Sequence, residues 1–340
     1  MFRDLVAKSP LCAEDFSDDG YLEDDEEDIP GGRVELNLKH LADLAREEAD
    51  DENLYPDAKS LNLTGVVFHE SRCGSTLVAN SLIAMNPEKH RVYSESAPPL
   101  AALTLCAKDG DSEGPCSIDQ GAQILRDVMY FMGRTDNLTE ERYFFKIQSA
   151  GTKNLPIFRM AFPETPWIFV YRDPVQVMMS HFAHGTKSAN CLRSLHRPPR
   201  LLKQLAHRRG YDVGNQNGKH SHLKEMSPPE FCAAHLATLT EMAADQIQES
   251  DELGQAVNYA SLPHVLYDKI LPSWGVDASE EEIENIQTIS GTYSKGRGEM
   301  HKEWKDDSEK KEELASPEIQ EASKIFLQES YETLQELANA

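Results

Sequence analysis

One stretch of this chain reads Val66-Val67-Phe68-His69-Glu70-Ser71-Arg72-Cys73-Gly74-Ser75-Thr76-Leu77-Val78-Ala79. Its apolar start indicates a buried strand, its middle a tight loop, and its end the first turn of a helix. Backbone N–H groups at a helix N-terminus bind anions, and a fixed positive charge beside them strengthens the attraction. The stretch therefore predicts a phosphate site between a strand and a helix.

The loop differs from that of proteins that bind nucleoside triphosphates. Their motif is G-x-x-x-x-G-K-[ST], in which a lysine follows the glycine. In this chain a basic residue, Arg72, precedes Gly74 instead. An ATP-dependent phosphotransferase of the P-loop type remains an alternative that the loop disfavours.

The charge of the chain is strongly acidic and uneven. Its 340 residues carry a formal net charge of −24, and ten carboxylates with no Lys or Arg lie between Glu14 and Asp28. This charge excludes the basic footprint of a nucleic-acid binder. A block of like charges with few apolar residues stays unfolded. We expect an acidic, partly disordered segment over 1–60, with one short helix at 35–48, and an α/β domain over 61–340. The acidic block is either a solvated leader or a docking or autoinhibitory tail.

The cysteines and the apolar runs bear on the protein's surroundings. The six cysteines contain no C-x-x-C pair, which argues against a zinc site and gives no sign of a disulfide framework. No apolar run approaches the roughly 20 residues that span a bilayer. The start, Met1-Phe2-Arg3-Asp4, lacks a signal-peptide core. The expectation is a cytoplasmic protein with neither a metal nor a membrane span.

Short apolar runs alternate with helical patterns along the rest of the chain. The expected strands are 64–68, 91–94, 143–147, 167–171 and 255–259. The expected helices are 76–85, 121–133, one from Ser227 to about Gln248, and two that follow Ser279 and Ser316. This alternation predicts a three-layer α/β/α fold around a central, mostly parallel sheet.

A second anion motif lies about one hundred residues after the first. The apolar run Trp167–Tyr171 ends at Arg172, Asp173 can cap the next helix, and Pro174 suits its first position. Ser180 follows Arg172 by eight residues, about two helical turns. The guanidinium and this hydroxyl are expected to converge on one phosphate; the alternative is that Arg172 and Asp173 form only a structural ion pair.

One basic stretch breaks the acidic trend. It comprises Lys187, Arg193, Arg197, Arg200, Lys203, Arg208 and Arg209. It is either a solvated face or a basic rim that attracts an anionic ligand.

Taken together, the motifs resemble those of the sulfotransferases that use 3′-phosphoadenosine-5′-phosphosulfate (PAPS). The first is Arg72 to Thr76 and the second is Arg172-Asp173-Pro174 through Ser180. Two weaker ones follow in the family's order, Tyr259-Ala260-Ser261-Leu262-Pro263 and Ser294-Lys295-Gly296-Arg297-Gly298. The resemblance spans residues 64 to 297.

The resemblance implies a P-loop type nucleotide-binding fold and a role for each matched residue. The 5′-phosphosulfate would be held by the first loop, which consists of Arg72, Cys73, Gly74, Ser75 and Thr76. The 3′-phosphate would be held by Arg172, Ser180, Lys295, Gly296 and Arg297. Arg72 stands where the family commonly has a catalytic lysine; arginine keeps the charge but cannot become neutral. A pocket that binds the nucleotide without catalysis is the remaining alternative. We also expect the Cys73 thiol, near Arg72 and a helix N-terminus, to have a lowered pKa.

Transfer of the sulfuryl group to a hydroxyl or amine needs a proton acceptor. Cytosolic family members use the histidine of a K-x-H segment, where this chain has Lys146-Ile147-Gln148. Golgi-type members use a glutamate about twenty residues after the loop, which corresponds here to Glu95. The resemblance thus implies that Arg72 and Glu95 are catalytic, with His69 and His181 as weaker candidates. The acceptor, a small molecule or a carbohydrate, has no readable signal.

Overall fold

The computed structural model describes residues 37–49, 58–106, 116–183, 185–195, 198–211, 226–250, 252–291 and 308–340. The chain divides into two compact units, Met1–Pro56 and Asp57–Ala340. In the first unit the described helix is α2 (Leu38–Ala49), which agrees with the expected short helix within three residues. The acidic block at 14–28 lies outside the described residues.

The second unit is built on a parallel sheet of five strands in the order β3-β5-β2-β6-β7. The strands are β2 (Leu63–His69), β3 (His90–Ser94), β5 (Arg142–Lys146), β6 (Trp167–Tyr171) and β7 (Gly254–Asn258). All five expected strands are confirmed within one residue at each end. A separate antiparallel pair, β1 (Lys59–Ser60) with β4 (Arg134–Thr135), was not predicted.

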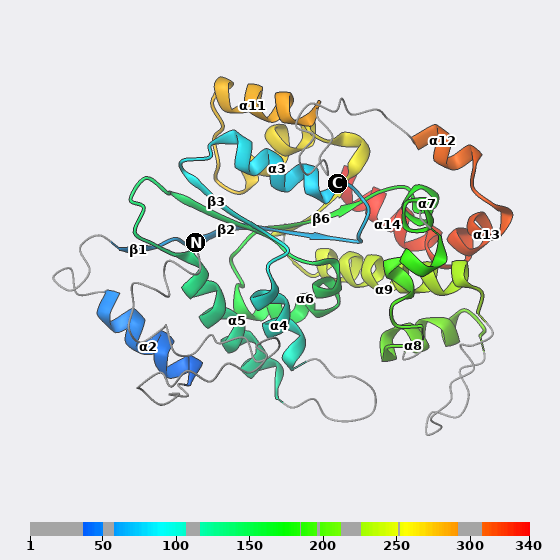
Figure 1. Cartoon of the computed structure of the whole chain (residues 1–340), viewed down its shortest axis with the longest axis horizontal. Helices are drawn as coiled ribbons and strands as arrows, with labels where there is room; N and C mark the ends of the chain where they lie inside the picture. The colour runs from blue at the N-terminus through cyan, green and yellow to red at the C-terminus, as the bar shows by residue number, and fades with distance from the viewer. Residues whose placement is uncertain are drawn as a thin grey trace, which may run out of the picture. The chain divides into compact units, whose positions relative to one another are not determined.

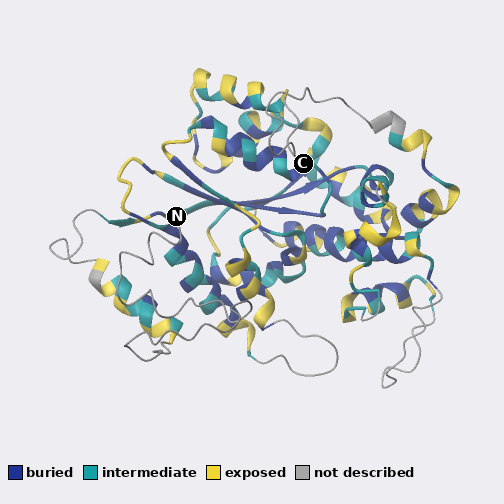
Figure 2. Ribbon diagram, viewed as in Figure 1, coloured by how far each residue is buried: buried dark blue, intermediate teal, exposed yellow. Residues whose placement is uncertain are grey.

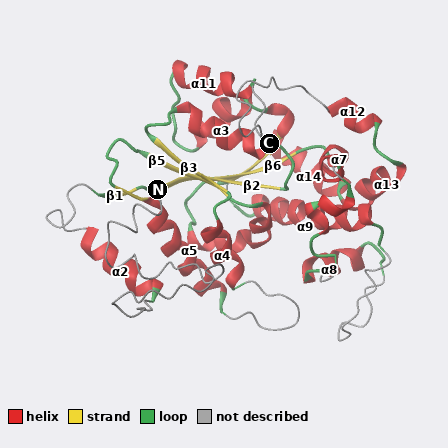
Figure 3. Cartoon of the chain, in the orientation of Figure 1, coloured by secondary structure: helices red, strands yellow, loops and turns green. Residues whose placement is uncertain are grey.

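Helices cover both faces of this sheet, so the predicted three-layer α/β/α fold is confirmed (Figures 1 and 3). They are α3 (Ser75–Met85), α4 (Ala97–Leu105), α5 (Ile118–Gly133), α6 (Leu155–Ala161), α7 (Pro174–Phe182), α8 (Arg200–Arg208), α9 (Pro228–Gln248), α10 (Leu271–Ser273), α11 (Glu280–Ser290), α12 (Ser308–Glu313), α13 (Pro317–Phe326) and α14 (Gln328–Asn339). The strands between them are largely buried (Figure 2).

Alternate strand residues feed two separate cores. Val67 and Ile168 pack with α3 on one face, whereas Val66, Phe68 and Phe169 pack with α5 and α6 on the other. Because both faces are covered, the strands read as continuous apolar runs rather than as alternating ones.

Side-chain caps begin several helices where the sequence predicts them. Ser227 and Ser279 form reciprocal capping boxes at α9 and α11, and Ser316 caps α13. Helix α5 begins three residues earlier than expected because Ser117 and Gln120 form a further capping box.

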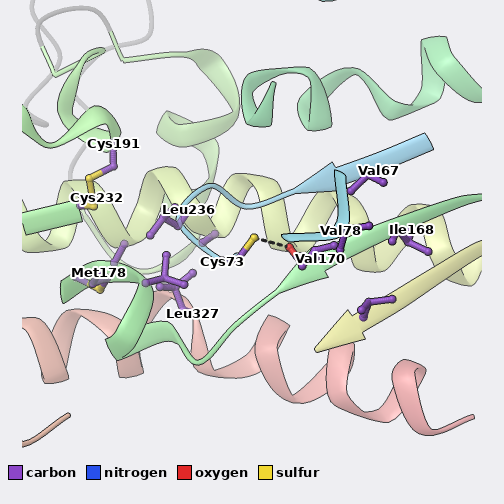
Figure 4. Close-up of a cluster of buried hydrophobic side chains, with 14 of the residues drawn as sticks. Val67, Cys73, Val78, Ile168, Val170, Met178, Cys191, Cys232, Leu236 and Leu327 are labelled. Carbon is purple, nitrogen blue, oxygen red and sulfur yellow. Dashed lines mark hydrogen bonds between the residues drawn. A yellow bond between two sulfur atoms is a disulfide. The ribbon is translucent and has the colours of Figure 1, made fainter. Parts of the chain in front are cut away.

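Two disulfides correct the expectation from the scattered cysteines. Cys106 is joined to Cys116, and Cys191 is joined to Cys232 of α9, with a Cα–Cα distance of 4.9 Å in both pairs. Figure 4 shows the second disulfide. The second links residues 41 apart in sequence, a pairing that spacing alone does not reveal.

Candidate functional site

The carboxyl ends of the five parallel strands bring the expected residues to one edge of the sheet. Strand β2 leads into the loop, β3 into Glu95, β6 into Arg172 and β7 into Tyr259, while Lys146 ends β5. The chain leaves the central strand β2 through α3 on one face and leaves β5 through α6 on the other. Ligands of open α/β sheets bind where successive connections diverge in this way.

The loop after β2 has a strained backbone. Ser71, Arg72 and Gly74 all have positive φ angles, of 75°, 57° and 87°. A Cβ atom on Gly74 would lie 2.2 Å from the ring of Tyr259, so both the backbone angle and this contact require glycine. Gly74 also caps α3, whose first N–H groups have no partner within the helix. Left-handed non-glycine residues cluster at ligand sites, and this loop fits the predicted anion cradle.

Arg72 links the two anion motifs. Its Nε and Nη2 donate to the backbone carbonyl of Ser180 in α7, at 3.3 and 3.1 Å. The first loop and the helix of the second motif are therefore in direct contact.

Arg172 is 8% exposed and is held on several sides. Its Nε donates to Oε1 of Gln176 at 2.6 Å, and its guanidinium carbon lies 4.6 Å from the centre of the Tyr259 ring. Asp173 accepts from the backbone N–H of Gln176 and so caps α7 as predicted. Arg172 lines a cavity of about 570 Å³. The other lining residues are Leu77, Asp173, Gln176, Asn258, Tyr259, Ala260, Leu262, Pro263, Ser290, Glu312, Tyr331 and Gln335.

Glu70 is a buried carboxyl that ties the motifs together a second time. It is 2% exposed, and its Oε1 accepts from the backbone N–H of Arg172 at 2.6 Å. Burial raises the pKa of Glu70 well above its ordinary value of 4.5. The sequence offered no signal for this contact, because the partners are 102 residues apart.

The raised pKa of Glu70 predicts how stability depends on pH. Above pH 4.5 the folded protein binds this proton more tightly than the unfolded chain does, so the contribution of Glu70 to stability falls as the pH rises. Glutamine does not titrate and keeps an oxygen for the Arg172 N–H. We therefore expect the stability of Glu70→Gln relative to the parent to rise between about pH 5 and pH 8. Urea unfolding at both pH values measures this gain; a difference that does not change with pH would contradict it.

Cys73 does not have the lowered pKa that was expected. Its side chain is fully buried in the core and its Sγ donates to the carbonyl of Val170 at 3.0 Å (Figure 4). Burial raises the pKa of this thiol to about 12. The Cys73 side chain therefore belongs to the hydrophobic core, and we do not assign it as a phosphate ligand.

Glu95 forms a cluster with two side chains from neighbouring strands. Its carboxylate contacts the ammonium of Lys146 and lies 3.6 Å from Nε2 of His69. Lys146 is 1% exposed and Glu95 is 48% exposed in their side chains, so the carboxylate is the outward-facing member. Glu95 has a φ of 59°, and the amide of Gln148 donates to its carbonyl at 2.9 Å.

The contacts of His69 fix its tautomer. Its Nδ1 accepts from the N–H of Ser71 at 3.0 Å, so Nε2 carries the proton and donates to the carbonyl of Ile147 at 3.0 Å. Both ring nitrogens of His69 are hydrogen-bonded to backbone groups, so this side chain stabilises the backbone at the start of the loop. Lys146 was missed as a site residue, although a charged residue inside the aromatic run Tyr143–Ile147 was a usable signal.

Other expected residues lie elsewhere or outside the described part. Arg208 and Arg209 of the basic stretch pair with Glu241 at 2.6 and 3.7 Å, and Arg209 also pairs with Glu329 at 2.8 Å, which makes this part a structural face. Arg197 and the late loop with Lys295, Gly296 and Arg297 lie outside the described residues. Among the residues that are described, no group of three or more His, Cys, Asp or Glu can hold a metal ion. None of the described helices is long and apolar enough to cross a bilayer.

The fold of the chain is similar to that of another protein of known structure. The chain is similar to sulfotransferase STF1 from Mycobacterium tuberculosis H37Rv, with 12% sequence identity over 85% of this chain and 81% of that chain, and a TM-score of 0.44. No protein-family model and no curated protein match the chain. A likeness of this size carries no argument on activity, which therefore rests on the residues of the site.

Proposed function

We propose that the protein is a sulfotransferase that moves a sulfuryl group from PAPS to a hydroxyl or amine of an acceptor. The observation that carries this proposal is the direct contact between the two anion motifs at one sheet edge, where Arg72 donates to Ser180 and Glu70 accepts from Arg172. Two linked cationic motifs suit a ligand that is phosphorylated at two positions.

The residues present fit this cofactor. Arg172 lines a cavity of about 570 Å³, and the aromatic side chains of Tyr259 and Tyr331 are among its other lining residues. Gly74 lets the loop backbone pass directly against the ring of Tyr259, because a Cβ there would lie 2.2 Å from that ring. In this proposal the 5′ end is held by Arg72, Gly74, Ser75 and Thr76, and the 3′-phosphate by Arg172 and Ser180. Lys295, Gly296 and Arg297 complete the second set. When bound, the cofactor would supply an activated sulfuryl group.

The protein's own part in the reaction is to bind, orient and accept a proton. Arg72 and the N–H groups of α3 stabilise negative charge at the loop. Glu95 accepts the proton of the acceptor, because it is the solvent-facing carboxylate at the same sheet edge. The buried ammonium of Lys146 holds that carboxylate in place. The acceptor, a small molecule or a carbohydrate, enters on this exposed side.

Binding measurements test the proposal. We expect adenosine 3′,5′-bisphosphate to bind without a divalent metal ion and to raise the melting temperature, and ATP with Mg²⁺ to bind more weakly. Binding of Mg-ATP without binding of the bisphosphate would indicate a phosphotransferase and overturn the proposal. Labelled sulfate should then pass from PAPS to at least one member of a panel of phenols, sugars and amines. Binding with no transfer across the panel would support a nucleotide-binding protein without this activity.

A further inference from the structure

The side chain of Gln176 lies between a guanidinium and a carboxylate. Its Oε1 accepts from Nε of Arg172 at 2.6 Å, and its Nε2 donates to Oε1 of Glu312 at 2.5 Å. Gln176 is 8% exposed, and its backbone N–H is bound to Asp173 at 3.0 Å in the first turn of α7. Both ends of this amide are therefore used inside the helix–helix contact between α7 and α12.

The chemistry of the two neighbours fixes which way the amide points. A guanidinium only donates hydrogen bonds, and an ionised carboxylate only accepts them. If the amide rotated by 180°, its NH₂ would face the Arg172 donor and its oxygen would face Glu312. Glu312, which is 136 residues away in sequence, thus sets the orientation of Gln176.

The held amide restricts the guanidinium of Arg172. One edge is bound through Nε to Gln176, and one face lies over Tyr259 at 4.6 Å. A bidentate contact between a guanidinium and a phosphate depends on the orientation of the planar fork. We propose that Gln176 is a positioning residue that orients Arg172 toward the 3′-phosphate, with Glu312 orienting the Gln176 amide. This inference rests on the proposed function, because it takes the ligand of Arg172 to be that phosphate.

Two nucleotides that differ only in the 3′-phosphate isolate this effect. The dissociation constants of adenosine 3′,5′-bisphosphate and adenosine 5′-monophosphate are measured by calorimetry for the parent and for Gln176→Leu. The dissociation constant of the monophosphate divided by that of the bisphosphate reports what the 3′-phosphate contributes to binding. We expect Gln176→Leu to lower this ratio about tenfold, in line with the loss of a well-oriented charged hydrogen bond, with 5′-monophosphate binding nearly unchanged. An unchanged ratio would overturn the proposal. Gln328→Leu is the control, because it breaks an exposed glutamine–glutamate hydrogen bond in α14 and neither of those residues lines the cavity.

Exchanging the amide of Gln176 and the carboxylate of Glu312 tests the role of Glu312, because the double variant has the same number of charges as the parent. Gln176→Glu alone sets two carboxylates against each other and should lower the ratio. Adding Glu312→Gln restores both hydrogen bonds. The carboxylate is then at position 176, where it accepts from Arg172, and the amide at position 312 donates to that carboxylate. We expect this double variant to recover much of the ratio, whereas Gln176→Glu with Glu313→Gln, which removes the same charge one residue away, should not. Equal recovery in both double variants would show that charge alone matters and would overturn the role of Glu312.

A measurement without ligand separates this inference from the proposed function. The Nε–H of Arg172, assigned by its loss in Arg172→Lys, should exchange slowly with solvent in nuclear magnetic resonance spectra of the parent and quickly in Gln176→Leu. If the parent binds neither nucleotide, the proposed function is wrong. If the Arg172 Nε–H exchanges at the same rate in the parent and in Gln176→Leu, the positioning role is wrong, whatever the binding result.

Discussion

Replacing Arg172 with alanine is expected to weaken the binding of adenosine 3′,5′-bisphosphate by about 100-fold or more. Removing one partner of a buried charged contact costs about 2–5 kcal/mol, because the groups left behind lose their counterpart. Here those groups include Asp173 and Glu312, which line the same cavity. Without the guanidinium, the cavity would present carboxylates to a phosphate, so repulsion adds to the lost hydrogen bonds.

Two further variants serve as controls for the effect of Arg172→Ala on binding. Arg172→Lys keeps the charge but loses the planar fork and the Nε bond to Gln176, so we expect an intermediate affinity. Arg142→Ala removes an arginine at the amino end of β5, at the opposite edge of the sheet, and should leave binding unchanged. Calorimetric titration measures all three. Parent-like affinity in Arg172→Ala would reject the phosphate role of this residue.

The sheet was predictable because its strands are apolar on both faces. Runs such as Trp167–Tyr171 have no polar interruption and end at residues that begin a turn or a cap. Helix starts were equally local, since Ser227 and Ser279 form their capping boxes with residues three positions away. The pair of β1 and β4 was missed because each strand has only two residues, too few to show an alternating pattern.

The contacts of the site were less accessible from the sequence. The motifs named Arg72, Glu95 and Arg172, and parallel strands carried all three to one edge. Their partners join segments that are far apart in the chain. Lys146 contacts Glu95 across 51 residues, and Gln176 contacts Glu312 across 136. The burial of Cys73 likewise depends on which way a left-handed loop turns, and composition does not determine that.

The loop glycine and Arg172 share one aromatic neighbour. Tyr259 packs against Gly74 and also lies under the Arg172 guanidinium, so one ring contacts both anion motifs. A tyrosine in the third of the four motifs thus contacts the two strongest ones. Its weak motif match gave no indication of that role.

Replacing Glu95 with glutamine is expected to lower kcat for sulfuryl transfer by about 10²–10⁴, the usual contribution of a general base. Glutamine has nearly the same shape and accepts a hydrogen bond from Lys146, but it does not take a proton at neutral pH. Cofactor binding should therefore stay close to that of the parent, and the loss should fall on kcat. Glu95→Asp keeps the carboxylate on a shorter side chain, so its kcat should lie between that of the parent and that of Glu95→Gln.

The same two strands supply a matched control for this variant at their amino ends. Lys89 and Glu141 form an exposed ion pair of 2.8 Å just before β3 and β5, whereas Glu95 and Lys146 meet where those strands end. Glu141→Gln thus breaks a lysine–glutamate pair on the same strands but at the wrong edge of the sheet, and we expect its kcat to match the parent. Steady-state rates with saturating PAPS compare the variants. If Glu95→Gln and Glu141→Gln have equal kcat values, Glu95 is not the base, and its ion pair with Lys146 serves only to hold the end of β3 against β5.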